Sequence, residues 1–256
     1  MGSDIILDCE SYATALRSIC GIFNLSEESL VNFLKDHTLY DEYNTKYSEI
    51  TDFNNFLCCT FINEYNIDLT LLKSVYWFHL ARTMDHQAYN MGILPLGEVE
   101  HKLLEDVYQL VRNAISHEEW KRIVKKLYCF AQHSCRLAKI YHGPYAILIK
   151  EQAYHLNEPG HHDYLAVPET IEDLCTVAKE ETGIDLLSMF QKASYPIIVK
   201  FLTDSQKGHR NIIKDTILYL HKKCLGEKIS PEGYGFDSEG KAILPSQIVK
   251  IEIVHI

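Results

Sequence analysis

Apolar residues near the start of the chain recur every three or four positions, the spacing of a helix with one buried face. This spacing predicts a helix over Tyr12–Phe23. It continues after Ser26, which we expect to cap a second helix, and again over Phe53–Tyr65. Residues 1–72 are therefore expected to form a helical N-terminal region.

The pattern changes at Val75–Thr83, where β-branched and aromatic residues follow one another without helical spacing. Such a run is typical of a buried strand. Similar runs occupy Tyr145–Ile149, directly after a Gly-Pro turn, and Pro196–Leu202. Two short runs, Ala242–Leu244 and Ile248–Val254, close the chain. We expect all of these segments to be strands.

Helical patterns lie between the predicted strands. They cover Glu98–Ala114, Glu118–Ile140, Glu169–Lys179 and Ile212–Cys224, the last of them ending near Gly226, whereas Lys228–Lys241 is expected to be a turn-rich loop. This mixture predicts an α+β fold in which residues 73–256 form one α+β domain after the helical region. No flexible linker separates the two parts.

Composition narrows the class of protein. Hydrophobic residues make up 46% of the chain, enough for a packed core. The formal net charge of -10 excludes nucleic-acid binding through bulk electrostatics, which needs an excess of Lys and Arg. The best candidate for a local basic patch is Lys121–Lys126, and the alternative is that this stretch is one solvated helix face.

The expected location is cytoplasmic. The segment Met1–Asp4 lacks the basic and apolar regions of a signal peptide, and no apolar run is long enough to span a membrane, so no membrane partner is expected. The 8 cysteines stand mostly in apolar helical runs, where free cysteine behaves as a small hydrophobic residue.

Candidate chemistry begins where the first strand becomes polar. His79, Arg82 and Thr83 stand there, ahead of the segment Gly92–Pro95. A histidine at such a rim can hydrogen-bond a ribose hydroxyl, and Thr83 can donate or accept. The alternative is a core histidine satisfied by the backbone, with Arg82 in a surface ion pair.

Tyr145 is the second candidate, because it begins a strand directly after the turn Gly143-Pro144. A ring in that position can stack on a planar heterocycle such as nicotinamide. The alternative is a tyrosine that packs on a sheet edge. The sequence contains no P-loop, no Gly-x-Gly-x-x-Gly after a strand, no paired Cys-x-x-Cys and no Gly-x-Ser-x-Gly.

Four segments follow one another along the chain in a fixed order. They are Phe78-His79-Leu80-Ala81-Arg82-Thr83, Gly92-Ile93-Leu94-Pro95, Gly143-Pro144-Tyr145-Ala146, and Ala242-Ile243-Leu244-Pro245 with Ile248–Val254. The set resembles the successive motifs of the diphtheria-toxin-like (His-Tyr-Glu) ADP-ribosyltransferase superfamily, which includes bacterial toxins that modify nucleic acids. The resemblance extends loosely from Val75 to Ile256 and implies the family's split mixed sheet with helical insertions.

The resemblance implies an NAD-dependent ADP-ribosyltransferase, with NAD as substrate. His79 would hold the ribose and carboxamide side of NAD, with help from Arg82, Thr83 and Gly92, and Tyr145 would stack on nicotinamide. The acceptor would be RNA, DNA or protein. The chain would be the toxin of a toxin–antitoxin or antiviral defence system, with an antitoxin protein as partner.

The chain also departs from the family pattern. Ala81 stands where the family usually has Ser or Thr, and Lys241-Ala242 stands where its third motif has Glu or Gln. Glu239 is the nearest carboxylate and is taken as the catalytic acid. The other candidate carboxylates are Glu151, Asp163 and Glu169. The missing acid leaves open a catalytically inactive interaction protein of the same fold.

A third possibility is a hydrolase that uses His162, Asp163 and Glu169. His161 and His162 suggest a metal ion, but neighbouring residues of an extended segment point to opposite faces, so no metal site is expected. Asp163 is a candidate for capping the turn that follows it.

Overall fold

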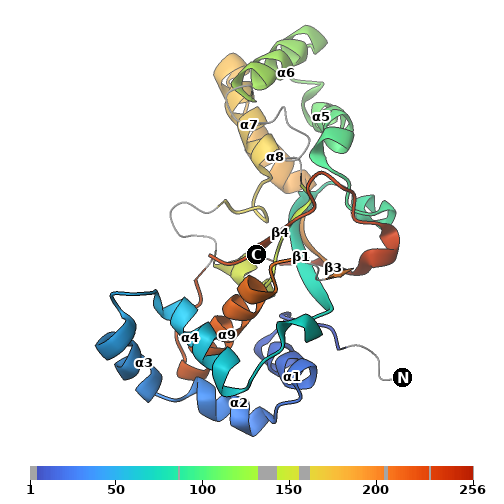
Figure 1. The fold of residues 1–256 in the computed structure, drawn as a ribbon. Coiled ribbons are helices and arrows are strands. Elements are labelled where there is room, and N and C mark those ends of the chain that lie inside the picture. Colours follow the sequence, from blue (N-terminus) through green and yellow to red (C-terminus); the bar gives the residue numbers. More distant parts are fainter. Residues whose placement is uncertain are drawn as a thin grey trace. The chain divides into compact units, whose positions relative to one another are not determined.

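The computed structural model describes residues 5–85, 87–131, 143–155, 162–204, 207–230 and 232–255, with side chains through 128 in the second range. Long helices and one five-stranded sheet make up these ranges (Figure 1), which confirms the predicted α+β class and its helical N-terminus.

The sheet has the strand order β4-β2-β1-β3-β5. The strands are β1 (Ser74–Thr83), β2 (Tyr145–Ile147), β3 (Tyr195–Asp204), β4 (Gly235–Asp237) and β5 (Ile248–Ile253). Strand β2 runs antiparallel to β1, with Phe78 opposite Ile147. Strand β5 runs antiparallel to β3, and the register shifts between Lys200 and Phe201. Four of the predicted strands are therefore confirmed, with small changes at their ends.

Two predictions about the end of the chain are wrong. The segment Ala242–Leu244 forms no strand and contributes only an isolated bridge between Ile93 and Ile243. The loop predicted over Lys228–Lys241 contains strand β4. A three-residue strand that itself begins with glycine shows too little alternation to be recognised from the sequence.

The chain divides into two compact units that interleave in the sequence. Unit 1 comprises Met1–Phe78, Ile147–Glu158 and Leu202–Gly235, and unit 2 comprises His79–Ala146, Pro159–Phe201 and Phe236–Ile256. The division predicted from the sequence falls at one point, between residues 72 and 73. Compactness is a different criterion, so that boundary stays a prediction.

Unit 1 is built around helix α9. Its helices are α1 (Tyr12–Phe23), α2 (Glu27–Leu34), α3 (Thr38–Glu42), the π-helix η1 (Tyr43–Tyr47), α4 (Phe53–Glu64), α9 (His209–Leu225) and the short 3-10 helices η2 (Leu69–Leu71) and η5 (Lys150–Tyr154). Helices α1, α2 and α4 pack against α9 (Figure 1). The Ser26 hydroxyl accepts a hydrogen bond from the Ser29 amide, and left-handed Gly226 ends α9, as predicted.

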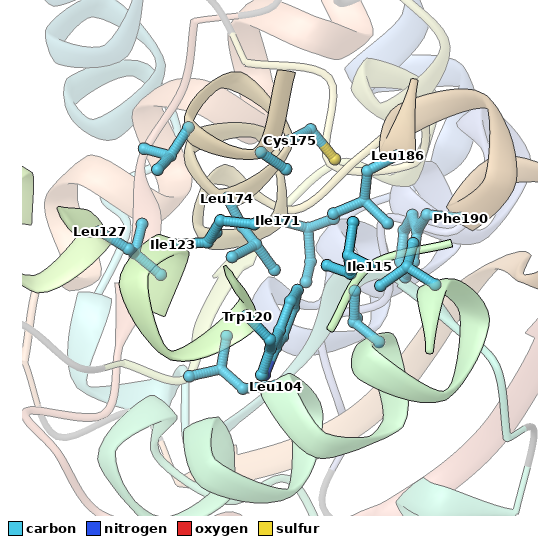
Figure 2. Packing of buried hydrophobic residues seen from close by; sticks show 14 of the residues in the cluster. Leu104, Ile115, Trp120, Ile123, Leu127, Ile171, Leu174, Cys175, Leu186 and Phe190 are labelled. Atoms are coloured by element: carbon cyan, nitrogen blue, oxygen red, sulfur yellow. The ribbon is translucent and has the colours of Figure 1, made fainter. Parts of the chain in front are cut away.

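Unit 2 has its own hydrophobic core, shown in Figure 2. Its helices are η3 (Ala88–Met91), α5 (Leu96–Val111), α6 (His117–Ala131), α7 (Glu169–Thr182), α8 (Leu186–Ala193) and η6 (Pro245–Gln247). Side chains from α5, α6, α7 and α8 point toward one another, with Trp120 beside Leu104 and Ile171 at the centre. The predicted helix over Glu118–Ile140 is confirmed as far as Ala131, and its remainder lies outside the described residues.

Two lysines of the basic stretch on α6 pair with glutamates. Lys121 lies 2.9 Å from Glu118, and Lys126 lies 2.9 Å from Glu180 and 3.0 Å from Glu181. The partners are largely solvent-exposed, so water screens each pair and its contribution to stability is small. This arrangement fits the interpretation of the stretch as a solvated helix face.

Two further sequence expectations bear on the described part of the chain. No helix in it is both long and apolar enough to cross a membrane. Its cysteines Cys9, Cys20, Cys58, Cys59, Cys175 and Cys224 are free thiols, and Cys129 and Cys135 lie outside the described side chains.

Candidate functional site

His79 is held against the first residue of the neighbouring strand. Its Nδ1 lies 2.7 Å from the main-chain oxygen of Tyr145. A carbonyl oxygen can only accept, so Nδ1 carries the hydrogen and donates. The neutral ring then keeps a lone pair on Nε2, and no described residue hydrogen-bonds that nitrogen. The His79 side chain and the Tyr145 backbone therefore meet on adjacent strands, β1 and β2.

The surroundings of His79 favour the neutral ring. Burial lowers the pKa of His79 below its ordinary value of 6.5, and the hydrogen bond with Tyr145 opposes that shift without cancelling it. A neutral imidazole with a fixed tautomer is a hydrogen-bond acceptor at Nε2. A histidine with a purely structural role would make the same backbone hydrogen bond. The structural and ligand-binding interpretations of His79 therefore differ in whether a ligand hydrogen-bonds Nε2.

Tyr145 presents its ring to solvent, with 46% of the residue exposed. It follows a cis Gly143-Pro144 peptide bond, and Gly143 has a positive φ of 56°. A Cβ on residue 143 would lie 2.8 Å from the Tyr145 ring atom Cδ2. Glycine at 143 therefore both permits the left-handed backbone and leaves space for the ring. An exposed, well-placed phenol can stack on a planar ligand.

Tyr89 is a member of this cluster that the sequence did not predict. It lies on η3, in the spacer expected to be a short turn, and its ring centroid is 5.8 Å from that of His79 at an angle of 53°. Burial raises the pKa of Tyr89 to about 12, so its phenol stays protonated at neutral pH. A lone aromatic in a polar spacer gives no signal, because its contact with His79 is tertiary.

Arg82 is bound by the protein itself. Its guanidinium donates to the Ser194 hydroxyl (2.8 Å), the Ser194 carbonyl (3.2 Å), the Leu165 carbonyl (3.0 Å) and the Gln191 carbonyl (2.6 Å). Burial lowers the pKa of Arg82, and the nearby charge of Asp163 opposes that shift. This geometry favours a structural role for Arg82 over the predicted contact with NAD, and it replaces the surface ion pair of the alternative interpretation.

Thr83 and Gly92 also have structural explanations. The Thr83 hydroxyl donates to the Asp85 carbonyl (3.0 Å) and accepts from the Asp85 amide (3.1 Å), which closes a local turn. Gly92 has φ 99° and ψ -178°, and a Cβ there would collide with the Ile243 carbonyl oxygen. Glycine at 92 therefore lets the chain approach residue 243 closely, where Ile93 and Ile243 form their bridge.

Glu239 lies in the segment that adjoins the start of β2. The amide of the preceding residue, Ser238, donates to the Pro144 carbonyl at 3.1 Å. Glu239 itself is exposed, has a positive φ of 55°, and its amide donates to an Asp237 carboxylate oxygen at 2.8 Å. Glu239, the predicted catalytic acid, therefore directly follows a residue whose backbone contacts Pro144, and Pro144 directly precedes Tyr145.

The segment from His162 to Glu169 carries a second polar cluster. The Tyr164 hydroxyl donates to a Glu169 carboxylate oxygen at 2.9 Å, and the rings of His162 and Tyr164 lie 4.6 Å apart, edge to face. The His162 Nε2 donates to the Val167 carbonyl at 2.5 Å. His161, the other half of the histidine pair, lies outside the described residues.

The two remaining candidate carboxylates have partners of their own. Asp163 accepts hydrogen bonds from the amides of Leu165 and Ala166, both at 3.0 Å, which confirms that it caps the following turn. Glu151, in unit 1, pairs with Lys223 at 2.7 Å and accepts from the Tyr219 hydroxyl at 3.0 Å.

Comparisons of this chain with protein-family models, with curated proteins and with solved structures find no match of any of the three kinds.

Proposed function

We propose that the chain is an NAD-dependent ADP-ribosyltransferase that transfers ADP-ribose to a macromolecular acceptor, RNA, DNA or protein. The supporting observation is the 2.7 Å hydrogen bond that fixes His79 against the Tyr145 backbone and places the ring hydrogen on Nδ1, so that Nε2 carries the lone pair. The ordered resemblance of the motifs around these residues supplies the reaction class. On this proposal the chain is the toxin of a toxin–antitoxin or antiviral defence system, and an antitoxin protein restrains it.

In the proposed reaction, NAD is the substrate. His79 Nε2 would accept a hydrogen bond from a ribose hydroxyl, and the Tyr145 ring would stack on nicotinamide. The bond between the ribose carbon and nicotinamide breaks, and its electron pair leaves with nicotinamide. Positive charge develops on the ribose as this bond lengthens, where the Glu239 carboxylate would stabilise it while the acceptor forms the new bond.

Release of nicotinamide from NAD tests this proposal directly. The wild-type chain is incubated with NAD and with RNA, DNA or cell lysate, and both nicotinamide and labelled acceptor are measured. His79→Ala removes the acceptor nitrogen and Tyr145→Ala removes the stacking ring, so each should lower the rate by at least about a hundredfold. His101→Ala, at an exposed position on α5, is the matched control and should keep the wild-type rate.

Folded wild-type protein that neither releases nicotinamide nor labels any acceptor would count against the transferase. Thermal melting of each variant separates loss of chemistry from loss of fold. Equal rates in wild type and His79→Ala would show that the imidazole has no part in the reaction.

A second candidate is a catalytically inactive interaction protein of the same fold, and a specific surface of unit 1 favours it. Tyr40, Tyr47 and Ile50 are 58%, 37% and 77% exposed and lie together on the segment that includes the π-helix. Tyr40 packs on Phe53 and Tyr47 on Phe56, with ring centroids 5.4 and 5.1 Å apart. Exposed aromatic groups on a rigid base are typical of protein-binding surfaces.

Cavities lined by residues of unit 1 also bear on the choice between the two candidates, because the proposed transferase would bind NAD beside His79 and Tyr145. One, of about 320 Å³, is lined by residues that include Glu10, Lys150, Glu151 and Lys223, and neither it nor a smaller one beside Asp215 is lined by His79 or Tyr145. Calorimetric titration with NAD distinguishes the two candidates. Folded protein that does not bind NAD would favour the interaction protein, and binding accompanied by nicotinamide release would favour the transferase.

A further inference from the structure

The segment after residue 162 is fastened to the strand that carries His79. Arg82, three residues beyond His79 on β1, donates to the Leu165 carbonyl at 3.0 Å and reaches Ser194 and Gln191 with its other nitrogens. Leu165 is buried and follows Tyr164 directly. The guanidinium therefore fixes the backbone next to Tyr164 at the polar end of β1.

Tyr164 is oriented from both sides within this segment. The His162 ring packs on it edge to face at 4.6 Å, and its hydroxyl donates to the Glu169 carboxylate at 2.9 Å. Glu169 is the first residue of α7, and Asp163 holds the intervening turn through two amide hydrogen bonds. The Tyr164–Glu169 pair is thus rigidly placed, with the carboxylate exposed.

The surroundings of the Tyr164 hydroxyl keep it in its protonated form. Burial, the negative charge of Glu169 and the neighbouring Tyr145 raise the pKa of Tyr164 well above its ordinary value. Tyr164 therefore remains a protonated donor to Glu169 at neutral pH. Its oxygen still has lone pairs that can accept a further proton or hydrogen bond.

We propose that Tyr164 and Glu169 form a proton relay for the acceptor in the transfer step. This inference rests on the proposed transferase function. As the acceptor oxygen or nitrogen bonds to the ribose carbon, its proton passes to the Tyr164 oxygen, and the phenolic proton passes to Glu169. Nicotinamide leaves with the electron pair of the broken bond. Tyr164 is the group that meets the acceptor, and Glu169 acts through it.

The relay specifies the chemical class of the acceptor. A hydroxyl, an amide or a protonated ring nitrogen must lose a proton when it becomes ADP-ribosylated, whereas a carboxylate has none to lose. A tyrosine backed by a carboxylate is useful only for the first class. The structure therefore assigns this site to a protic nucleophile, as nucleobases, sugar hydroxyls and serine or threonine side chains provide.

Nicotinamide release in the presence and absence of sodium azide tests the relay. In buffer, water is the acceptor and must lose a proton, whereas azide is an anion that needs no base. Glu169→Gln keeps an oxygen acceptor for Tyr164 but cannot take its proton, and Tyr164→Phe removes the relay atom. Each variant should release nicotinamide at least about tenfold more slowly than wild type, and azide should restore most of the rate by forming ADP-ribosyl azide.

Two comparisons make the test specific. Glu118→Gln, on the exposed first turn of α6, is the matched control and should behave as wild type with and without azide. The double variant of Tyr164 and Glu169 should be no slower than either single variant, because the two act as one unit.

Each outcome decides a different question. Wild-type protein that releases no nicotinamide removes both the transferase and the relay. An active wild type with Glu169→Gln and Tyr164→Phe at the same rate removes the relay alone. Slow variants that azide does not restore, at unchanged melting temperature, would also overturn it, because the defect would then lie in cleavage of the nicotinamide bond.

Discussion

Replacing Arg82 with methionine should destabilise the protein without a direct effect on NAD binding. Methionine keeps the apolar stem but removes every hydrogen bond from the guanidinium to Ser194, Leu165 and Gln191. Three carbonyl oxygens and one hydroxyl then lose a charged donor. The sequence predicts instead that Arg82 contacts NAD, and this substitution separates the two roles.

The size of the effect follows from those hydrogen bonds. A hydrogen bond from a charged donor contributes about 1.5–3 kcal/mol. Arg82 is half-buried, so water can replace part of what is lost, and the contributions of one guanidinium do not add fully. We expect a loss of about 3 kcal/mol in the free energy of unfolding, which lowers Tm by about 6–12 °C in a protein of this size.

The assay combines thermal melting with NAD titration of the folded protein. Arg112→Met is the matched control, because Arg112 is exposed and its guanidinium donates to the Gln109 side chain at 2.9 Å. Its Tm should change by no more than about 2 °C. A variant of Arg82 that melts like wild type but binds NAD more weakly would refute the structural role and restore the contact with NAD.

Three further predictions concern stability. Burial lowers the pKa of His79 in the folded state, so the neutral imidazole contributes stability above about pH 6.5. This stability is lost as the pH falls through the lowered pKa. Between about pH 7.5 and about pH 5.5, the Tm of His79→Gln should therefore fall less than that of wild type, and equal slopes would contradict this prediction. Gly92→Ala should lower the free energy of unfolding by at least about 1–3 kcal/mol, because the backbone conformation at residue 92 is nearly restricted to glycine and the added Cβ meets the Ile243 carbonyl. Gly183→Ala is the control, because φ is 75° there but the space is open, and it should lower the free energy of unfolding by less in the same denaturation experiment. Phe190→Ala should lower the free energy of unfolding by about 3–5 kcal/mol, because the ring is fully buried in the core of unit 2. Urea denaturation measures this change, and a value under about 1 kcal/mol would mean that the core is loosely packed.

Local patterns in the sequence were sufficient for much of the fold. The apolar spacing predicted α1, Ser26 marked the start of α2, and Gly226 marked the end of α9. Helix α8 was missed although a signal existed: Asp185 caps it by accepting from the Ser188 amide at 3.2 Å. An aspartate followed by apolar residues at helical spacing is a recognisable helix start.

The site was only partly predictable, because its decisive contacts are tertiary. The order of motifs pointed to His79 and Tyr145 together, and the structure places them on adjacent strands. The partners of Arg82 come from residues about a hundred positions away, at 165, 191 and 194, and no local pattern reveals them. For the same reason, the packing of Tyr89 on His79 was not foreseen.

The imidazole of His79 is oriented by a main-chain atom, so its orientation does not depend on the side chain at position 145. Every amino acid at position 145 supplies the same carbonyl oxygen, so the phenol can be exchanged for another side chain without disturbing the tautomer of the histidine. Variation of the side chain at position 145 therefore leaves this hydrogen bond, and with it the proton on Nδ1, in place.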